Sequence, residues 1–212
     1  MITAFRVVLI AATALFGVGP STAETPAEYG QAMRLPADSA EGRRLYQSCA
    51  QCHGANGEGS SSTLVPRIGG QHFSVLIRQL VDYRQGKRQN ERMQVASDEH
   101  RLANAQAIAN VATFINLLKT KWPANKGTGL LAQEGALIYD ARCRGCHGPA
   151  AQGDDAKVIP RLAGQNYGYL VKQFGDIAAG KRPNVSRQHV DMLKGFEYQE
   201  ITALSDYLSL II

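Results

Sequence analysis

Two histidines and all the cysteines of the chain stand at spacings that could hold a prosthetic group. They form two CxxCH pentads, made of Cys49, Cys52 and His53, and of Cys143, Cys146 and His147. This pentad is the attachment pattern of a c-type haem. Each thiol can add to one vinyl group, and the imidazole that follows can bind the iron from the same side of the ring. The chain is therefore predicted to carry two covalently bound haem c groups, with His53 and His147 as axial ligands.

Other uses of paired cysteines fit the chain less well. Zinc ribbons place their CxxC pairs about 15–20 residues apart, whereas Cys143 follows Cys49 by 94 positions. A thioredoxin-like CxxC gives no reason for a histidine after the second cysteine. Disulfide scaffolds are denser in cysteine than this chain, which has 4 in 212 residues. Haem attachment accounts for every cysteine and for both histidines.

The N-terminus has the pattern of an export signal. Arg6 precedes an apolar run over residues 7–18, and small residues at 21–23 precede Glu24. We expect a secretory signal peptide over residues 1–23, because the apolar run is short for a membrane span. An uncleaved membrane anchor is the alternative. Covalent haem attachment in bacteria requires export, so both features predict a periplasmic protein.

Charge and motifs argue against a nucleic-acid partner and against an enzyme. The formal net charge is +5, and removing residues 1–23 takes away Arg6 and leaves +4. The propionates of two haems would bring this value close to zero. The sequence has no basic run, aromatic-interleaved patch or phosphate-binding loop. It also has no catalytic triad, HExxH helix or dinucleotide fingerprint, so we expect no small-molecule substrate.

The chain contains an internal sequence repeat. With a shift of 94 positions, residues 49–90 match residues 143–184 at 16 of 42 positions. The matches include a Pro-Arg-x-x-Gly-Gln segment and a Gly-Lys-Arg-x-Asn segment, at 66–71 and 86–90 and again at 160–165 and 180–184. Such a repeat indicates duplication of a small domain. A domain as short as one repeat can bury only a small apolar core with its own side chains, and a buried haem would enlarge that core.

Helical periodicity predicts the same elements in both halves. Apolar residues recur at helical spacing in segments 39–48, 72–85, 104–118, 132–142, 166–179 and 197–210. Before the pentads, Leu45 and Tyr46, or Leu137 and Ile138, should face inward. Residues 119–129 contain one proline and two glycines and are expected to form a linker. We expect an all-α fold, with cytochrome-like units over 24–118 and 130–212.

The pentads and their repeated flanking segments resemble the dihaem cytochrome c4 family, a duplicated class I cytochrome c. The resemblance covers nearly the whole chain after residue 23. It implies two tandem all-α domains related by an approximate twofold axis, each enclosing one haem. It also implies electron transfer in the periplasm or at the outer face of the inner membrane, often toward a terminal oxidase.

The second axial ligand of each iron is expected to be a methionine sulfur, which raises the reduction potential. After residue 23 the methionines are Met33, Met93 and Met192, and Met33 precedes the first pentad. Met93 and Met192 are therefore the expected ligands. They do not occupy equivalent positions in the repeat, and His189 lies closer to the place that the family uses. His189 is thus the alternative ligand of the second iron.

The resemblance also implies residues that support the haem. In class I cytochromes a proline carbonyl after the pentad accepts a hydrogen bond from the ligating histidine, and Pro66 and Pro160 match it. Arg67 and Arg161 could pair with haem propionates. Prolines that only shape the loop, and ordinary surface arginines, are the alternatives.

We therefore expect a periplasmic dihaem cytochrome that transfers single electrons between redox proteins of the respiratory chain. It could also associate with the inner membrane from the outside. The main alternative is a haem-bearing subunit of a larger dehydrogenase that oxidises sulfide or an alcohol. A dihaem peroxidase is less favoured, because it would need an open position at one iron and a longer chain.

Overall fold

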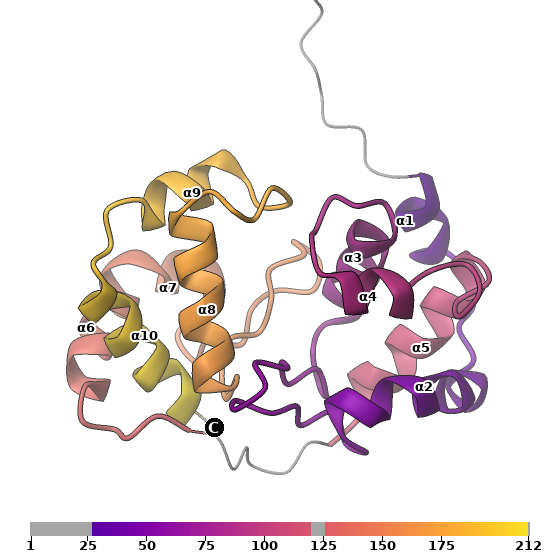
Figure 1. The fold of residues 1–212 in the computed structure, drawn as a ribbon, viewed down its shortest axis with the longest axis horizontal. Helices are drawn as coiled ribbons and strands as arrows, with labels where there is room; N and C mark the ends of the chain where they lie inside the picture. The colour runs from indigo at the N-terminus through magenta and orange to yellow at the C-terminus, as the bar shows by residue number, and fades with distance from the viewer. Residues whose placement is uncertain (1–26, 120–125, 212) are drawn as a thin grey trace, which may run out of the picture.

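The computed structural model describes residues 27–119 and 126–211, and over these ranges the secondary structure is helical (Figure 1). The first half contains α1 (Ala27–Ala32), α2 (Ser39–His53), α3 (Phe73–Arg84), α4 (Glu91–Ala96) and α5 (Ala105–Leu117). The second half contains α6 (Ala132–Arg142), α7 (Arg144–His147), α8 (Tyr167–Ala178), α9 (Arg187–Leu193) and α10 (Tyr198–Leu210). Within the same ranges β pairing is limited to isolated bridges, one in each half. The all-α fold class is confirmed.

The two halves form separate bodies that lie side by side (Figure 1). Every segment with helical periodicity is a helix, with ends that differ by a few residues from those expected. Four shorter helices, α1, α4, α7 and α9, were not expected, because elements of 4 to 7 residues are too short to show a period. The predicted signal peptide at 1–23 and linker residues 120–125 lie outside the described residues.

Each half is closed by two helices that cross at a glycine. Helix α2 packs on α5, and α6 packs on α10. A Cβ added at Gly42 would lie 2.1 Å from the backbone oxygen of Asn110, and one at Gly135 would lie 2.0 Å from that of Ala203. Any larger residue would push the helices apart, so these glycines permit the close approach of the two backbones.

Each half has its own apolar core. The first is built around Tyr46, Ile77 and Ile108, and the second around Tyr139 and Leu204. The expectation that Leu137 faces inward was wrong, because its side chain is 71% exposed. Gly135 and Tyr139 are four residues apart on the face of α6 that meets α10. A residue two positions from both must point the other way.

Reciprocal hydrogen bonds join the two halves. The side-chain amide of Gln71 donates to the Arg161 carbonyl at 3.0 Å, and its oxygen accepts the Arg161 N–H at 2.9 Å. The amide of Gln165 does the same with Arg67, at 2.8 and 2.7 Å. Gln71 and Gln165 are equivalent in the repeat, so these contacts have the approximate twofold symmetry that the duplication predicts.

Replacing Gly135 with alanine should destabilise the second half by about 1–3 kcal/mol, because the new Cβ would collide with the backbone of α10. The free energy of unfolding of the haem-loaded protein, measured with urea, tests this. Gly175→Ala is the control, because a Cβ in the middle of α8 would meet no atom within 4 Å. That change should leave stability unchanged or raise it slightly. Equal effects of the two changes would contradict the close-approach role of Gly135.

Gln165→Ala should loosen the contact between the halves, because it leaves the Arg67 N–H and carbonyl without partners. Hydrogen exchange of the backbone over residues 65–71 should rise by at least about tenfold, because two hydrogen bonds to the Arg67 backbone are lost. Gln89→Ala is the control, since the exposed Gln89 side chain bonds within its own turn to Gly86. Unchanged protection in Gln165→Ala would show that these bonds do not hold the halves together.

Candidate haem sites

The first pentad occupies the last turn of α2. The helix begins after Asp38, whose side chain accepts hydrogen bonds from two N–H groups of the first turn, and ends before Gly54. It continues through the pentad, five residues beyond the end expected at residue 48. Cys49 is half-buried, Cys52 is exposed and the His53 side chain is buried. Four residues separate Cys49 from His53, so both point to the same side of the helix.

The second pentad repeats this arrangement on a broken helix. Helix α6 ends at Arg142, Cys143 is the junction, and α7 carries the remainder of the pentad. The N–H of His147 donates to the carbonyl of Cys143 at 3.0 Å, so the helical path continues across the junction. Cys143 is half-buried, Cys146 is exposed and His147 is buried, as in the first half.

Each pentad histidine is held by a proline carbonyl. His53 Nδ1 lies 3.0 Å from the Pro66 carbonyl oxygen, and His147 Nδ1 lies 3.0 Å from that of Pro160. A carbonyl can only accept, so Nδ1 carries the proton and Nε2 has a free lone pair. Burial lowers the pKa of both histidines, which keeps the imidazoles neutral at pH 7. Neutral imidazole with a free Nε2 is the form that binds a metal.

Glycines allow the loops to bring these carbonyls back to the pentads. Gly59 has φ of +65° and donates its N–H to the His53 carbonyl at 2.8 Å. A Cβ at Gly59 would lie 2.4 Å from the Pro66 oxygen, the atom that contacts His53. Gly153 occupies the same place in the second half, with φ of +74°. Both positions therefore require glycine in order to place the proline carbonyl.

The donor set in each half fits a covalently bound haem. None of the cysteines is in a disulfide, so all of them are available for haem attachment. Burial raises the pKa of the Cys49 thiol and raises that of Cys143 to about 11, so both are protonated before attachment. Two thiols and one imidazole with an unprotonated Nε2 stand on one helical stretch, which is what thioether attachment and axial ligation require.

The residues expected on the opposite side of the haems lie on short helices. Met93 is half-buried on α4, and Met192 is half-buried on α9. His189 is also on α9, and burial together with the charge of Arg182 lowers its pKa. The ring centroids of His147 and His189 are 6.1 Å apart. The structure thus brings His189 next to the proximal ligand of the second half.

Arg67 and Arg161 lie at the contact between the halves. A guanidinium nitrogen of Arg67 donates to the Gly164 carbonyl at 3.3 Å, and the Nε of Arg161 is buried without a partner among the described residues. Burial, and then the charge of Arg161, lowers the pKa of Arg67. Two arginines that repel each other in this way favour an anion nearby, and haem propionates are anions of suitable geometry.

A second polar cluster joins the halves, and the sequence did not reveal its role. Arg88 donates to Gln79, Tyr169 and Gln173, while Arg182 donates to Gln173 and Gln79. Arg88 with Arg182, and Gln79 with Gln173, are equivalent pairs of the repeat. The signal was therefore present as repeated polar residues. Their contact could not be foreseen, because partners lie about a hundred residues apart.

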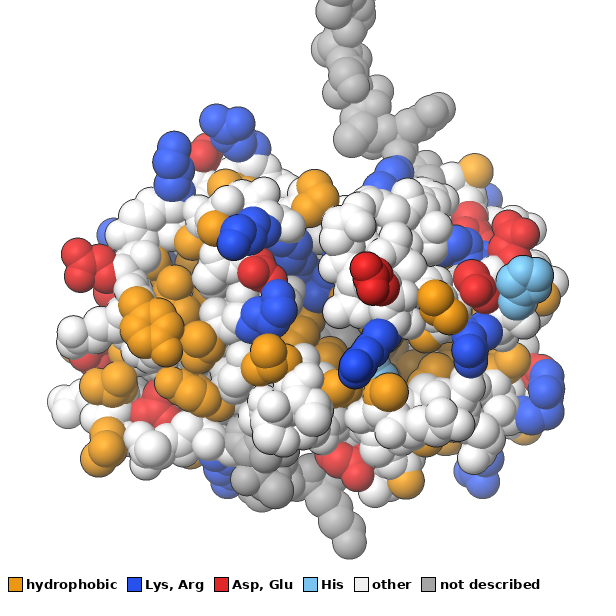
Figure 2. Space-filling model, viewed as in Figure 1, with side chains coloured by type: hydrophobic (Ala, Val, Ile, Leu, Met, Phe, Trp, Pro, Cys, Tyr) orange, Lys and Arg blue, Asp and Glu red, His pale blue; other side chains and the backbone are white. Residues whose placement is uncertain are grey.

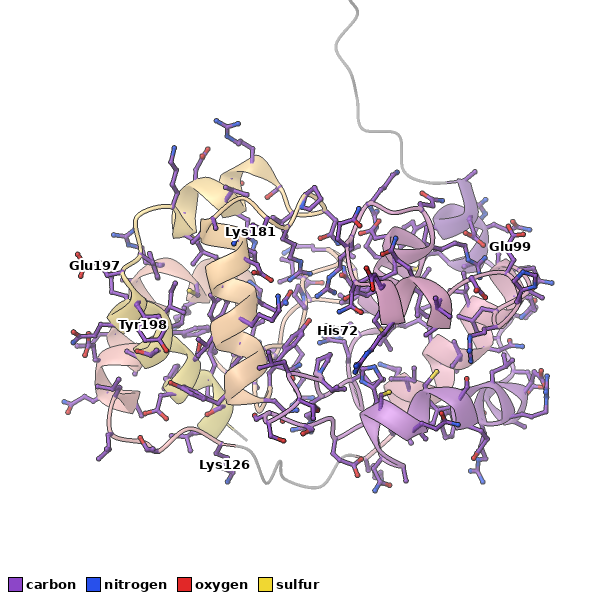
Figure 3. The ribbon with its side chains drawn as sticks, viewed as in Figure 1. His72, Glu99, Lys126, Lys181, Glu197 and Tyr198 are labelled. Atoms are coloured by element: carbon purple, nitrogen blue, oxygen red, sulfur yellow. The ribbon has the colours of Figure 1, made fainter. Side chains whose placement is uncertain are left out.

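Apolar side chains gather on the exposed face of the second half (Figure 2). Tyr198, at the start of α10, is 75% exposed and can be located in Figure 3. Basic and acidic side chains are interspersed on the same face, without a continuous basic stripe there. An apolar patch surrounded by mixed charge is typical of a protein-docking surface.

His72 has a structural role at the contact between the halves. It lies between them in Figure 3, and its Nε2 is 2.7 Å from the carbonyl oxygen of Gln152. Two residues later, the N–H of Ser74 donates to the Asp155 carboxylate at 2.9 Å. These bonds attach the start of α3 to the loop that follows the second pentad.

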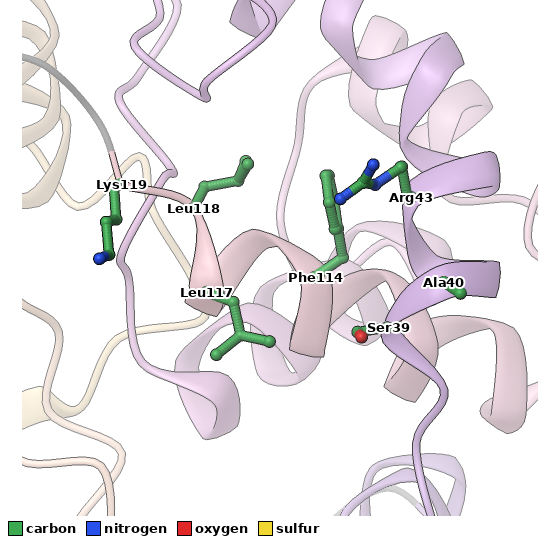
Figure 4. A pocket seen from close by; sticks show the side chains of 7 residues that line it. All are labelled: Ser39, Ala40, Arg43, Phe114, Leu117, Leu118 and Lys119. Atoms are coloured by element: carbon green, nitrogen blue, oxygen red, sulfur yellow. The ribbon is translucent and has the colours of Figure 1, made fainter.

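One hollow of the first half is remote from its pentad. It has a volume of about 540 Å³ and is lined by the start of α2 and the end of α5, including Arg43, Phe114 and Lys119 (Figure 4). Helix α2 has 15 residues, so the hollow and His53 lie about 20 Å apart along its axis. It is not the haem site.

Among the helices described within residues 27–119 and 126–211, none combines the length and the apolar character needed to cross a bilayer.

Comparison with known proteins places the chain among dihaem cytochromes. The Cytochrome c family profile matches residues 39–119 and again 132–210. Cytochrome c4 of Thiocapsa roseopersicina is 30% identical over 173 residues, covering 76% of this chain and 85% of that protein. A thiosulfate dehydrogenase electron acceptor of Stutzerimonas stutzeri is 30% identical over 195 residues, covering 84% and 89%. The crystal structure of reduced cytochrome c4 from Pseudomonas stutzeri shares the fold, with a TM-score of 0.74 at 24% identity over 84% of this chain and 100% of that one.

Replacing Cys143 and Cys146 together with alanine should leave one covalent haem per chain, because the second pentad then offers no thiol. Mass spectrometry of the denatured protein measures the haems that remain attached. The matched variant, Cys49→Ala with Cys52→Ala, should also retain one haem, held by the other pentad. Two attached haems in either double variant would contradict the assignment of the pentads.

Proposed function

The chain belongs to the dihaem cytochrome c4 family, and we propose that it is a periplasmic carrier of single electrons between redox proteins of the respiratory chain. It holds two covalently attached haem c groups and acts in electron transfer, as its relatives do. We propose that the carrier delivers its electrons to a terminal oxidase. No bond of a substrate is made or broken in this activity, so the chain is not an enzyme by itself.

The residues of each half position the haem, and the bound iron supplies a reversible one-electron change. Cys49 and Cys52 attach the first haem, and Cys143 and Cys146 attach the second. His53 and His147 would bind the irons through Nε2, while the carbonyls of Pro66 and Pro160 hold their Nδ1 protons. Arg67 and Arg161 would neutralise propionates where the halves meet. Met93 is the proposed distal ligand of the first iron, and Met192 or His189 that of the second.

The observation that carries this proposal is the pair of buried, neutral pentad histidines, each 3.0 Å from a proline carbonyl. Such a bond fixes the tautomer and the orientation of a metal ligand. The same arrangement occurs twice, and reciprocal hydrogen bonds through Gln71 and Gln165 hold the two copies together. Two haem sites joined by these hydrogen bonds suit internal electron exchange.

A second candidate function is electron acceptance from a dedicated dehydrogenase. The relative in Stutzerimonas stutzeri, named a thiosulfate dehydrogenase electron acceptor, matches 84% of this chain. The alternative expected from the sequence was a haem subunit of a dehydrogenase that oxidises sulfide or an alcohol. Between these two, this relative favours a sulfur compound as the substrate that the partner oxidises. In that role the chemistry belongs to the partner and the chain only removes its electrons.

The proposed location is the periplasm, with association to the outer face of the inner membrane as a further option. It is supported by the export pattern of residues 1–23 and by the requirement of covalent haem attachment for an exported chain. The apolar patch of the second half would serve as a docking surface for a redox partner. Basic and acidic groups around it would orient the encounter.

Reductive titration of the purified oxidised protein should consume two electrons per chain. An anaerobic titration with dithionite, followed by visible spectroscopy, counts them. The variant with Cys143→Ala and Cys146→Ala should take up one electron per chain, because it holds one haem. Uptake of one electron by the unaltered protein would contradict a two-haem carrier.

The rate at which the oxidised protein is reduced by each candidate donor distinguishes the two candidate functions. The oxidised protein should be reduced by quinol-oxidising membranes and reoxidised by membranes that contain a terminal oxidase. Addition of thiosulfate dehydrogenase and thiosulfate tests the second candidate. Rapid reduction in this mixture alone, without exchange with membranes, would favour the dehydrogenase acceptor over the respiratory carrier.

A further inference from the structure

We propose that His189 is the distal axial ligand of the second iron, so that the two haems of this chain have different ligand sets. The first iron would be bound by His53 and Met93, and the second by His147 and His189. This inference rests on the two haem sites of the proposed function and specifies the chemistry of one of them. It replaces Met192, the residue that the sequence favoured.

Equivalent helix positions support His189. Asn90 precedes α4, and its side chain accepts the N–H of Met93 at 3.0 Å. Ser186 precedes α9, and its hydroxyl oxygen accepts the N–H of His189 at 3.3 Å. Met93 and His189 are therefore each the third residue after the capping residue of their helix. His189 occupies in the second half the position that the distal methionine occupies in the first.

Met192 stands one turn away from that position. It is the sixth residue of α9, three residues after His189. Three residues advance about 4.5 Å along a helix axis. The backbone of Met192 is therefore displaced by that distance from the helix position that Met93 occupies in the first half.

The distance between the two imidazoles fits an iron between them. An imidazole nitrogen lies about 2 Å from a metal it binds, and about 1.1 Å from the centre of its own ring, so two imidazoles on opposite sides of one metal have centroids about 6 Å apart. The centroids of His147 and His189 are 6.1 Å apart. The Nδ1 of His147 is occupied by Pro160, which leaves Nε2 for the metal.

His189 has no other evident role in the part of the chain that the structure describes. Its ring nitrogens form no hydrogen bond there, in contrast to His72, whose Nε2 contacts the Gln152 carbonyl. It is half-buried, whereas His100, in the corresponding region of the first half, is exposed. A partly buried imidazole with unpaired nitrogens beside another imidazole is well placed to bind a metal.

Different ligands would separate the reduction potentials of the two haems. A methionine sulfur raises the potential of a haem relative to a second histidine. The first haem would therefore hold the electron more strongly, and the second would be the more reducing site. An electron that enters at the second haem would pass to the first across the contact between the halves.

The test uses the intact dihaem protein and the red charge-transfer band of a ferric haem bound by a methionine sulfur. Amplitude is expressed per haem, counted in the denatured protein. The unaltered protein should show the band for one haem of two. Met93→Leu should abolish it, and Met192→Leu should leave it unchanged. The proposal would be overturned if the unaltered protein showed the full band amplitude for both haems and Met192→Leu reduced that amplitude by half.

A gain of signal provides an independent check that does not depend on removing a ligand. His189→Met places a thioether at the position equivalent to Met93, so the band should double and the lower of the two potentials should rise. No change in band or potential in a variant that holds both haems would overturn the proposal. The electron count per chain stays at two in every variant, so failure of the ligand assignment is separate from failure of the proposed carrier function.

Discussion

The hydrogen bond between each pentad histidine and a proline carbonyl is the interaction around which each half is organised. It fixes the proton at Nδ1 and leaves Nε2 with a free lone pair, the form in which an imidazole binds a metal. The carbonyl comes from a residue 13 positions along the chain, so the intervening loop must return to the pentad. Gly59 and Gly153 make that return possible, because a side chain at either position would collide with the backbone oxygen of Pro66 or Pro160.

The segment that carries this proline also builds the contact between the halves. Arg67 follows Pro66, and its backbone is bound by the side chain of Gln165. Gln71 closes the same segment and binds the backbone of Arg161 in the other half. The placement of each histidine is therefore connected to the docking of the two domains by a few residues of chain. This accounts for the presence of the whole Pro-Arg-x-x-Gly-Gln segment in both copies.

The symmetry fails on the distal sides, and the motif Gly-Lys-Arg-x-Asn shows where. In the first half its asparagine, Asn90, caps α4. The equivalent Asn184 instead donates to the Asp82 carboxylate of the other half at 2.9 Å, and Ser186, two residues later, caps α9. The capping residue of α9 therefore lies two positions later in the repeat than that of α4, and His189 is the third residue after it, as Met93 is the third after Asn90. The side chain of Asn184 also donates to Gln79 at 3.3 Å, so this asparagine takes part in the contact between the halves instead of capping a helix.

The sequence by itself determined the number of haems, the duplicated all-α architecture and the six longer helices, because covalent attachment and helical periodicity depend on residues close together in the chain. It was wrong about Leu137, since the face of α6 that meets α10 is selected by the close approach at Gly135. It could not show the cluster of Arg88 and Arg182 or the short helices α4 and α9. Only the tertiary structure placed the ring of His189 6.1 Å from that of His147, because contacts between residues far apart in the chain are not encoded in local periodicity.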